Sequence, residues 1–219
     1  MFKIIFRKYR KGGIVMKNYI SINNQKTALT DEQVAQIRAA FGLSDTKLSD
    51  VAVGDTVKIG QHEFIVLEHS RDTTALILKG LLYETKQFSN GSNDYRGSIV
   101  DGLLVRFEAE MAAVVGENNL VLHTVDLTSD DGLKDYGKIK RKVSLLTTDL
   151  YRRYVKILDK HKIDKWWWLA TPYSTKAHGN SSWVKCVSPS GCIYGNDCGY
   201  FHFGVRPFCI LNSDIFVSK

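Results

Sequence analysis

The spacing of apolar positions along the chain predicts two principal helices. Between Ser98 and Val115 apolar side chains recur every three or four residues, and Gly116 suits the end of a helix. A second helix is predicted after Thr147 or Thr148, because either hydroxyl can cap its first turn. Its apolar side consists of Leu150, Tyr154, Ile157 and Leu158.

Alternating apolar and polar positions predict strands before, between and after these helices. Residues 53–68 alternate on both sides of Gly60-Gln61, which is typical of a hairpin, and a third strand is expected at 74–78. Further strands are expected near 120–127, 142–146 and 205–211. Helices and antiparallel strands in this order predict an α+β fold.

The N-terminal part predicts a separate small module. Residues 19–26 are typical of a strand that turns at Asn23-Asn24, and residues 30–33 form a capping box that opens a helix. Residues 1–15 contain five basic residues and no acidic one, so we expect a disordered basic leader, or an artefact of a start upstream of Met16. The predicted division is a leader at 1–15, a strand-turn-helix module at 16–48 and a main domain at 50–219.

Charge and composition exclude several classes of function. The net charge is +7, but the leader contributes +5 of it, so the rest of the chain gives little support for binding nucleic acid, which needs clustered basic residues. The sequence has no pattern of a secretory signal and no run of about 18 apolar residues that would cross a membrane. We therefore expect synthesis in the cytoplasm and no nucleic-acid or membrane partner.

Catalytic and metal-binding motifs are not found in the sequence. It contains no G-x-S-x-G, no H-E-x-x-H and no C-x-x-C. A zinc site is disfavoured by the spacing of its four best ligands, Cys192, Cys198, His202 and Cys209. We expect free thiols, with Cys186 and Cys209 as small buried apolar residues, and we predict no metal, no cofactor and no enzymatic activity.

Two apolar blocks near the C-terminus are predicted to form a rigid framework. They span residues 166–172 and 204–208. In a strand, Trp167 would pack toward one side and its two neighbouring tryptophans toward the other. The guanidinium of Arg206 suits a structural ion pair or a clamp on backbone carbonyls. The predicted structural residues are Trp166, Trp167, Trp168, Gly204, Arg206 and Pro207.

The polar and aromatic segments between these blocks are predicted to bind a ligand. Residues 194–203 contain no Lys, Glu, Gln, Met or Trp, only the small, polar and aromatic types that are typical of antibody paratopes. A second polar loop at 173–182 is expected to adjoin the first. The alternative is an irregular connection whose rings fold inward. The predicted ligand-binding residues are Tyr194, Asn196, Asp197, Cys198, Tyr200, Phe201, His202 and Phe203, with Tyr173, Ser174, Lys176, His178, Asn180 and Trp183 from the second segment.

Several sequence features occur in an order that resembles a family of mostly uncharacterised bacterial and phage domains. They are a hairpin opened by residues 53–55, the long helix, the segment 143–147, Trp167-Trp168-Leu169 followed by Thr171-Pro172, and a closing segment at 204–207. Members typically have W-W-L-R-S-P, a strand with a V-x-x-x-G turn, and G-V-R-P. The resemblance covers residues 50–212 and departs from the family at Ala170, where Arg is usual, and at Phe208, where Ala is common. The family in turn is similar to the C-type lectin-like fold shared by formylglycine-generating enzymes and the variable proteins of diversity-generating retroelements. The resemblance implies a C-type lectin-like fold with long C-terminal loops.

The retroelement resemblance also implies a function. In such systems a reverse-transcribed template mutates adenines, chiefly in AAC or AAT codons near the 3′ end of the gene. Every residue type in 194–203 can be encoded by a codon ending in a pyrimidine, as those codons do. The implied protein is of phage or prophage origin, sometimes carried in the phage particle, and displays a hypervariable loop to a protein or cell-surface ligand. The alternatives are a redox enzyme that uses Cys192 or Cys198, and a phage structural or assembly protein.

Overall fold

The computed structural model describes residues 2–5, 9–11, 14–16, 19–22, 25–40 and 46–218. The chain divides into two compact units, one from Met1 to Thr46 and one from Lys47 to Val217. Among the described residues no helix is long and apolar enough to cross a membrane. Each unit is described by itself below.

The first unit contains small sheets and one helix. Strands β1 (Phe2–Ile5), β4 (Tyr19–Ile22) and β5 (Gln25–Ala28) form an antiparallel sheet, and β2 (Tyr9–Lys11) pairs with β3 (Ile14–Met16). Strands β1 and β2 therefore lie in the segment that we assigned to a disordered leader, and the division of the chain at residue 16 stays a prediction. The predicted turn at Asn23-Asn24 lies outside the described residues.

The predicted capping box opens the helix of the first unit, α1 (Asp31–Ala40). The backbone N–H of Gln33 donates to Thr30 Oγ1 at 3.1 Å, and the N–H of Thr30 donates to Gln33 Oε1 at 2.9 Å. These reciprocal bonds satisfy two donors that would otherwise lack a partner, which confirms this prediction.

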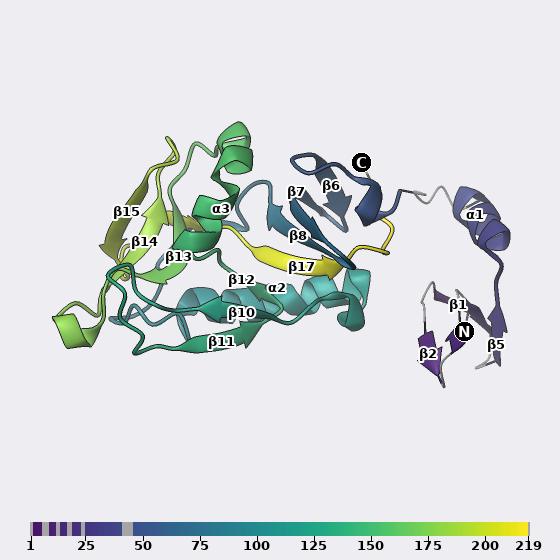
Figure 1. The fold of residues 1–219 in the computed structure, drawn as a ribbon, viewed down its shortest axis with the longest axis horizontal. Helices are drawn as coiled ribbons and strands as arrows, with labels where there is room; N and C mark the ends of the chain where they lie inside the picture. The colour runs from purple at the N-terminus through teal and green to yellow at the C-terminus, as the bar shows by residue number, and fades with distance from the viewer. Residues whose placement is uncertain are drawn as a thin grey trace. The chain divides into compact units, whose positions relative to one another are not determined.

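The second unit contains two five-stranded sheets. In the first sheet all neighbours are antiparallel, and the predicted hairpin around Gly60 is confirmed. In the second sheet one pair of neighbours, β13 and β16, is parallel. The first sheet has the order β12 (Val143–Ser144), β17 (Phe208–Asn212), β8 (Thr73–Leu78), β7 (His62–Ser70) and β6 (Thr56–Ile59), and the second has the order β15 (Ile193–Asp197), β14 (Trp183–Val187), β13 (Trp167–Pro172), β16 (Phe203–Val205) and β9 (Tyr83–Lys86). Figure 1 shows β17, β8, β7 and β6 of the first sheet and β13, β14 and β15 of the second.

The chain passes from one sheet to the other at Arg206-Pro207. The single strand predicted at 205–211 is therefore wrong: Val205 ends β16 in one sheet, and Phe208 begins β17 in the other. Proline has no N–H to donate to a sheet, which favours a break at this point. The carbonyl of Pro207 still accepts a bond of 2.9 Å from the N–H of Leu78, so the break is held against β8.

The buried guanidinium of Arg206 holds this crossover in place. Its Nε donates to the carbonyl of Leu78 at 2.9 Å, and its Nη2 donates to the carbonyls of Lys79 at 3.0 Å and His161 at 3.4 Å. The group also lies 5.2 Å from the centre of the Trp167 ring. Burial lowers its pKa to about 10. Arg206 is thus a clamp on backbone carbonyls.

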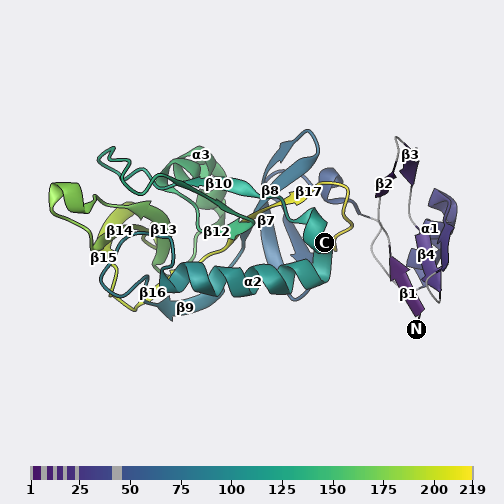
Figure 2. The ribbon, with the colours of Figure 1, turned by 90° about the horizontal axis from the view of Figure 1, so that it is seen from below.

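Two main helices pack against the sheets, as Figure 2 shows for α2. Helix α2 (Ile99–Val115) begins at Ser98, whose Oγ accepts from the N–H of Asp101 at 3.0 Å, and ends at Gly116, which has a φ of 84°. Helix α3 (Thr148–Leu158) is capped by Thr147. Both predicted helices are confirmed. The hairpin of β10 (His123–Asp126) and β11 (Lys138–Arg141) and the short helices η1 (Leu48–Asp50), η2 (Glu117–Asn119), η3 (Asp159–His161) and η4 (Lys176–His178) complete the unit.

Strand β13 is buried on both faces and separates two hydrophobic cores. All six of its residues are buried. Trp168 packs with Phe88 and Phe203 in the core that includes α2, whereas Trp167 packs with Tyr151 in the core that includes α3. The alternation follows from the pleat of the strand. The structure is therefore a mixed α+β protein with two main helices and several sheets.

The clamp predicts that Arg206→Lys lowers the free energy of unfolding by about 2–3 kcal/mol, because an ammonium cannot satisfy three carbonyls with the geometry of a planar guanidinium. Urea denaturation measures this quantity. The matched control is Arg152→Lys, whose side chain is exposed and which should change stability by less than about 0.5 kcal/mol. Equal effects in the two variants would contradict the clamp.

Candidate functional site

Large aromatic side chains are exposed together at the end of the second unit where β14 and β15 lie. Among the described residues, every large aromatic side chain that is strongly exposed comes from residues 173–201, with exposed fractions between 40% and 59%. The other strongly exposed large apolar residues are aliphatic and lie elsewhere in the sequence. We call this set the aromatic surface: Tyr173, Trp183, Tyr194, Tyr200 and Phe201.

The pairing of β14 with β15 places Trp183 and Tyr194 on opposite faces of one ribbon. Trp183 lies opposite Asp197, and Lys185 lies opposite Gly195, so these residues share one face. Tyr194 lies opposite Cys186 and points to the other face. The ribbon is the outer edge of its sheet (Figure 1), so both faces extend beyond the cores.

On the first face, the ring of Tyr173 lies across Gly195. A Cβ atom at Gly195 would lie 2.9 Å from Tyr173 Cδ2 and 3.4 Å from Trp183 Cε3, so this close approach requires glycine. The ring centres of Tyr173 and Trp183 are 6.0 Å apart. Behind them, the ammonium of buried Lys185 lies 5.1 Å from the Tyr173 ring centre and pairs with Asp130 at 3.0 Å.

On the second face, Trp166 lies between the sheet and the exposed rings. It stacks on Phe203 with a centroid distance of 5.2 Å and an interplanar angle of 8°, and contacts Tyr194, also at 5.2 Å. Tyr200 packs edge-on against Phe203 at 5.0 Å. The exposed rings of this face thus rest on a rigid aromatic base.

The amide of Asn93 holds the two predicted loops beside each other. Asn93 is fully buried, and its Nδ2 donates to the carbonyls of Ser174 at 2.9 Å and Trp183 at 2.8 Å. Its Oδ1 accepts from the hydroxyl of Tyr136 at 2.7 Å. The N–H of Cys198 donates to the carbonyl of Ser182 at 2.6 Å, which joins the second loop to the first. The loops adjoin, as we expected.

The connection between β10 and β11 fixes the segment that contains η4. Asp131 accepts hydrogen bonds from Ser129, from Ser174 Oγ at 2.6 Å and from His178 Nδ1 at 3.0 Å. These bonds hold the pKa of Asp131 well below its usual range. Asp135 likewise accepts from Thr175 Oγ1. The carboxylates of this connection act as hydrogen-bond acceptors for the loop at 173–182.

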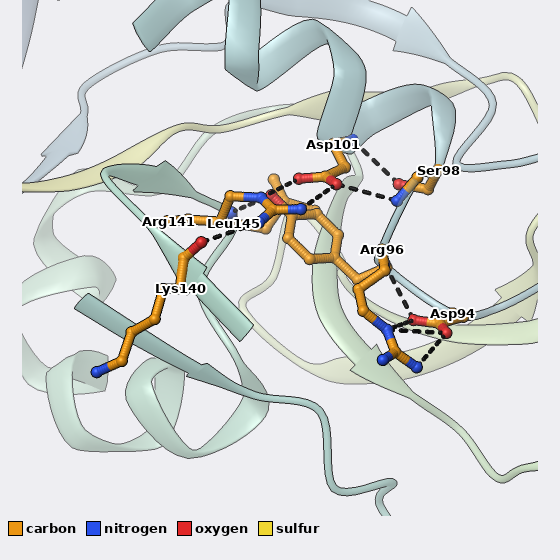
Figure 3. A network of polar contacts seen from close by, with 9 residues as sticks. Asp94, Arg96, Ser98, Asp101, Lys140, Arg141 and Leu145 are labelled. Carbon is orange, nitrogen blue, oxygen red and sulfur yellow. Dashed lines mark hydrogen bonds and ion pairs between the residues drawn. The ribbon is translucent and has the colours of Figure 1, made fainter. Parts of the chain in front are cut away.

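The residues before α2 are anchored by the network in Figure 3. The guanidinium of Arg141 binds both oxygens of buried Asp101, at 2.8 Å and 2.7 Å, and joins the first turn of α2 to β11. Tyr95 is fully buried, and its hydroxyl accepts from the N–H of Leu145 at 3.3 Å. Burial and the nearby Asp101 carboxylate raise the pKa of Tyr95. The network therefore fixes the start of α2 against β11.

Most predicted ligand-binding residues are accessible, but three are buried. Ser174, Cys198 and Phe203 have exposed fractions of 4% or less. Ser174 donates to Asp131, the carbonyl of Cys198 accepts from the loop before α2, and the ring of Phe203 packs against two tryptophans. A direct ligand contact needs an exposed side chain, so we no longer assign one to these three. The accessible or partly accessible residues are Tyr173, Lys176, His178, Asn180, Trp183, Tyr194, Asn196, Asp197, Tyr200, Phe201 and His202.

Sequence reasoning missed the residues that position these loops. Asn93 lies in a polar run between a strand and a helix, and Asp131 lies in a polar turn, so neither has a periodic signal that marks a role. Their importance depends on contacts between residues that are 43 to 90 positions apart in the sequence. The one sequence signal that could have marked the segments around Asn93 and Asp131 is their high content of polar side chains.

Three of the four cysteines are buried, and only Cys192 is exposed. In the described part of the chain, no three His, Cys, Asp or Glu side chains come together as metal ligands. Cys186, Cys198 and Cys209 are buried, and burial raises the pKa of each, to about 12 for Cys186 and Cys209. A raised pKa disfavours the thiolate that such chemistry requires. Cys192 is exposed in the turn between β14 and β15.

Comparison of the chain with protein-family models, curated proteins and solved structures found no significant match. The family resemblance and the C-type lectin-like fold therefore stay predictions.

Burial predicts that only one thiol reacts readily in the folded protein. At neutral pH, Ellman's reagent should label Cys192 at least about 100-fold faster than Cys186, Cys198 or Cys209, because access and thiolate formation control the rate. Mass spectrometry of labelled peptides identifies each site, and labelling in urea gives the rates without the fold. Fast labelling of Cys198 in the folded protein would contradict its burial.

Proposed function

We propose that this chain is a non-enzymatic ligand-binding protein, and that the aromatic surface contacts a protein or cell-surface ligand. The observation that carries the proposal is the concentration of the strongly exposed large aromatic side chains in residues 173–201, within the described part of the chain. Single exposed apolar residues are common on protein surfaces and need no explanation. Several exposed rings from one short part of the chain are more typical of an interaction site.

The supports beneath the rings favour recognition. Tyr173 rests on Gly195, and Tyr200 rests on Phe203, so each ring is already held close to one position before a ligand arrives. Preorganised aromatic side chains lose little conformational entropy on binding and bury a large area. Short polar side chains between them, such as Asn196 and Asp197, supply hydrogen bonds.

The finer part of the proposal is a C-type lectin-like domain of phage or prophage origin whose C-terminal residues vary, as in the variable proteins of diversity-generating retroelements. Its support is the sequence resemblance, the composition of 194–203 and the mixed α+β fold with two main helices. The structure adds a division within that segment. Tyr194, Tyr200 and Phe201 are exposed, whereas Cys198 and Phe203 are buried, so a varying segment would keep a fixed internal support.

The proposal predicts that the triple variant Tyr194→Ala, Tyr200→Ala, Phe201→Ala binds its ligand at least about 100-fold more weakly, because buried aromatic anchors supply much of the free energy of binding. The measurement is capture of envelope proteins and glycans from the host bacterium by the immobilised protein, followed by titration of the captured ligand. Retained affinity in the variant would contradict the proposal.

A matched control distinguishes binding by the aromatic surface from non-specific binding by exposed apolar side chains. The double variant Val105→Ala, Leu122→Ala removes apolar side chains that are 51% and 55% exposed outside this surface. It should bind like the wild type, and both sets of variants should unfold within about 1 kcal/mol of the wild type, since exposed positions contribute little to stability. Equal loss of binding in both sets would identify non-specific adhesion.

Phe203→Ala is expected to act differently from the exposed rings. Its side chain is only 4% exposed and packs against Trp166 and Trp168, so removing it should lower the free energy of unfolding by about 3–5 kcal/mol. Thermal or urea denaturation measures the loss. A stability close to that of the wild type would mean that Phe203 is a ligand contact rather than a support.

A further inference from the structure

We propose that the outer edge of β15 binds an extended peptide segment of the partner protein, which adds a strand to the sheet. The inference rests on the proposed function and specifies the class of ligand. Strand β15 is the last strand of its sheet, next to β14 alone. An edge strand can pair through its backbone with any segment that offers an extended conformation.

The hydrogen bonds between β14 and β15 show which backbone groups point outward. The N–H of Cys198 donates to the carbonyl of Ser182, and the N–H of Ser188 donates to the carbonyl of Cys192. In an antiparallel pair such bonds recur at every second residue. Tyr194 and Asn196 therefore bond to β14, and the N–H and C=O of Ile193 and Gly195 point away from it.

These outward groups have no partner within the described residues. The equivalent groups of Asp197 are already used, because its N–H donates to Asn196 Oδ1 at 2.8 Å and its carbonyl accepts from the N–H of Tyr200 at 3.0 Å. No corresponding bond reaches Ile193 or Gly195, and both residues are partly exposed. The open stretch of the edge therefore runs from Ile193 to Gly195.

The features that usually block edge pairing are missing from this stretch. Protected edges carry lysine, proline or a bulge. Strand β15 has neither lysine nor proline, and its register with β14 is continuous from Ile193 to Asp197. The sole charged side chain of the strand, Asp197, lies at its end.

The rings on both faces of the ribbon define the side chains that the peptide should carry. A residue paired with Gly195 would point to the face of Tyr173 and Trp183, and its two neighbours would point to the face of Tyr194. Tyr173 and Trp183 are exposed on the first face, and Tyr194 is exposed on the second. We therefore infer a segment with apolar side chains at successive positions, held by its backbone between two aromatic walls.

The experiment uses a phage-displayed library of random, unstructured peptides, selected on the full chain. For a selected synthetic peptide, hydrogen exchange measured by NMR should slow by about tenfold or more at the amides of Ile193 and Gly195. The amides of Tyr194 and Asn196, which already bond to β14, should change little. This alternation within one strand distinguishes strand addition from simple covering of the surface.

Variants of one residue supply the matched test. Ile193→Pro removes an outward N–H and should weaken peptide binding about tenfold, whereas Ile193→Val keeps the N–H and should bind like the wild type. Thermal denaturation of both variants checks the fold. If Ile193→Pro fails to fold, the exchange pattern of the wild type still decides the question.

Several results would overturn the inference. They are failure to select any peptide, binding without protection of Ile193 and Gly195, and protection of these amides by increasing protein concentration alone, which would identify a second copy of this chain as the occupant. In each case the proposed function is judged separately by the ring variants. If ligand capture needs the exposed rings but not the outer edge of β15, the proposed function is supported and strand addition is contradicted.

Discussion

The burial of β13 on both faces is the constraint on which the second unit depends. Because Trp167 and Trp168 alternate, one strand supports two cores, each covered by its own helix. The neighbouring strands then extend from these cores toward the edge of the sheet, and β15 lies beyond both. Within β15, Ile193 still packs against the core that includes α3, whereas the ring of Tyr194 is exposed.

The guanidinium of Arg206 and the amide of Asn93 each fix the path of a connecting segment. Arg206 holds the point where the chain changes sheets, and Asn93 holds the two loops beside β15. Both are buried polar groups that bind backbone carbonyls, so each fixes a path of the chain without depending on the identity of the side chains around it. Such a framework tolerates substitution of exposed residues, which a diversified surface would require.

Periodicity was sufficient to predict much of the framework and little of the site. The helices of 98–115 and 148–158 and the hairpin at Gly60 follow from local patterns that the sequence shows directly. The change of sheet at Arg206-Pro207 was missed, because partners of β16 and β17 lie far away in the sequence. Composition located the exposed segments, but the burial of supports such as Cys198 and Phe203 depends on contacts with residues far apart in the sequence.

The central claim is that residues 173–203 form a recognition surface on a fixed support. The most direct measurement is to sequence the 3′ part of the gene from many isolates of one host population. The account predicts substitutions concentrated at the codons of exposed residues, among them Tyr194, Asp197, Tyr200 and Phe201, with Trp167, Trp168, Gly204 and Arg206 unchanged. Variation spread evenly over the gene, or equal in buried and exposed codons, would contradict it.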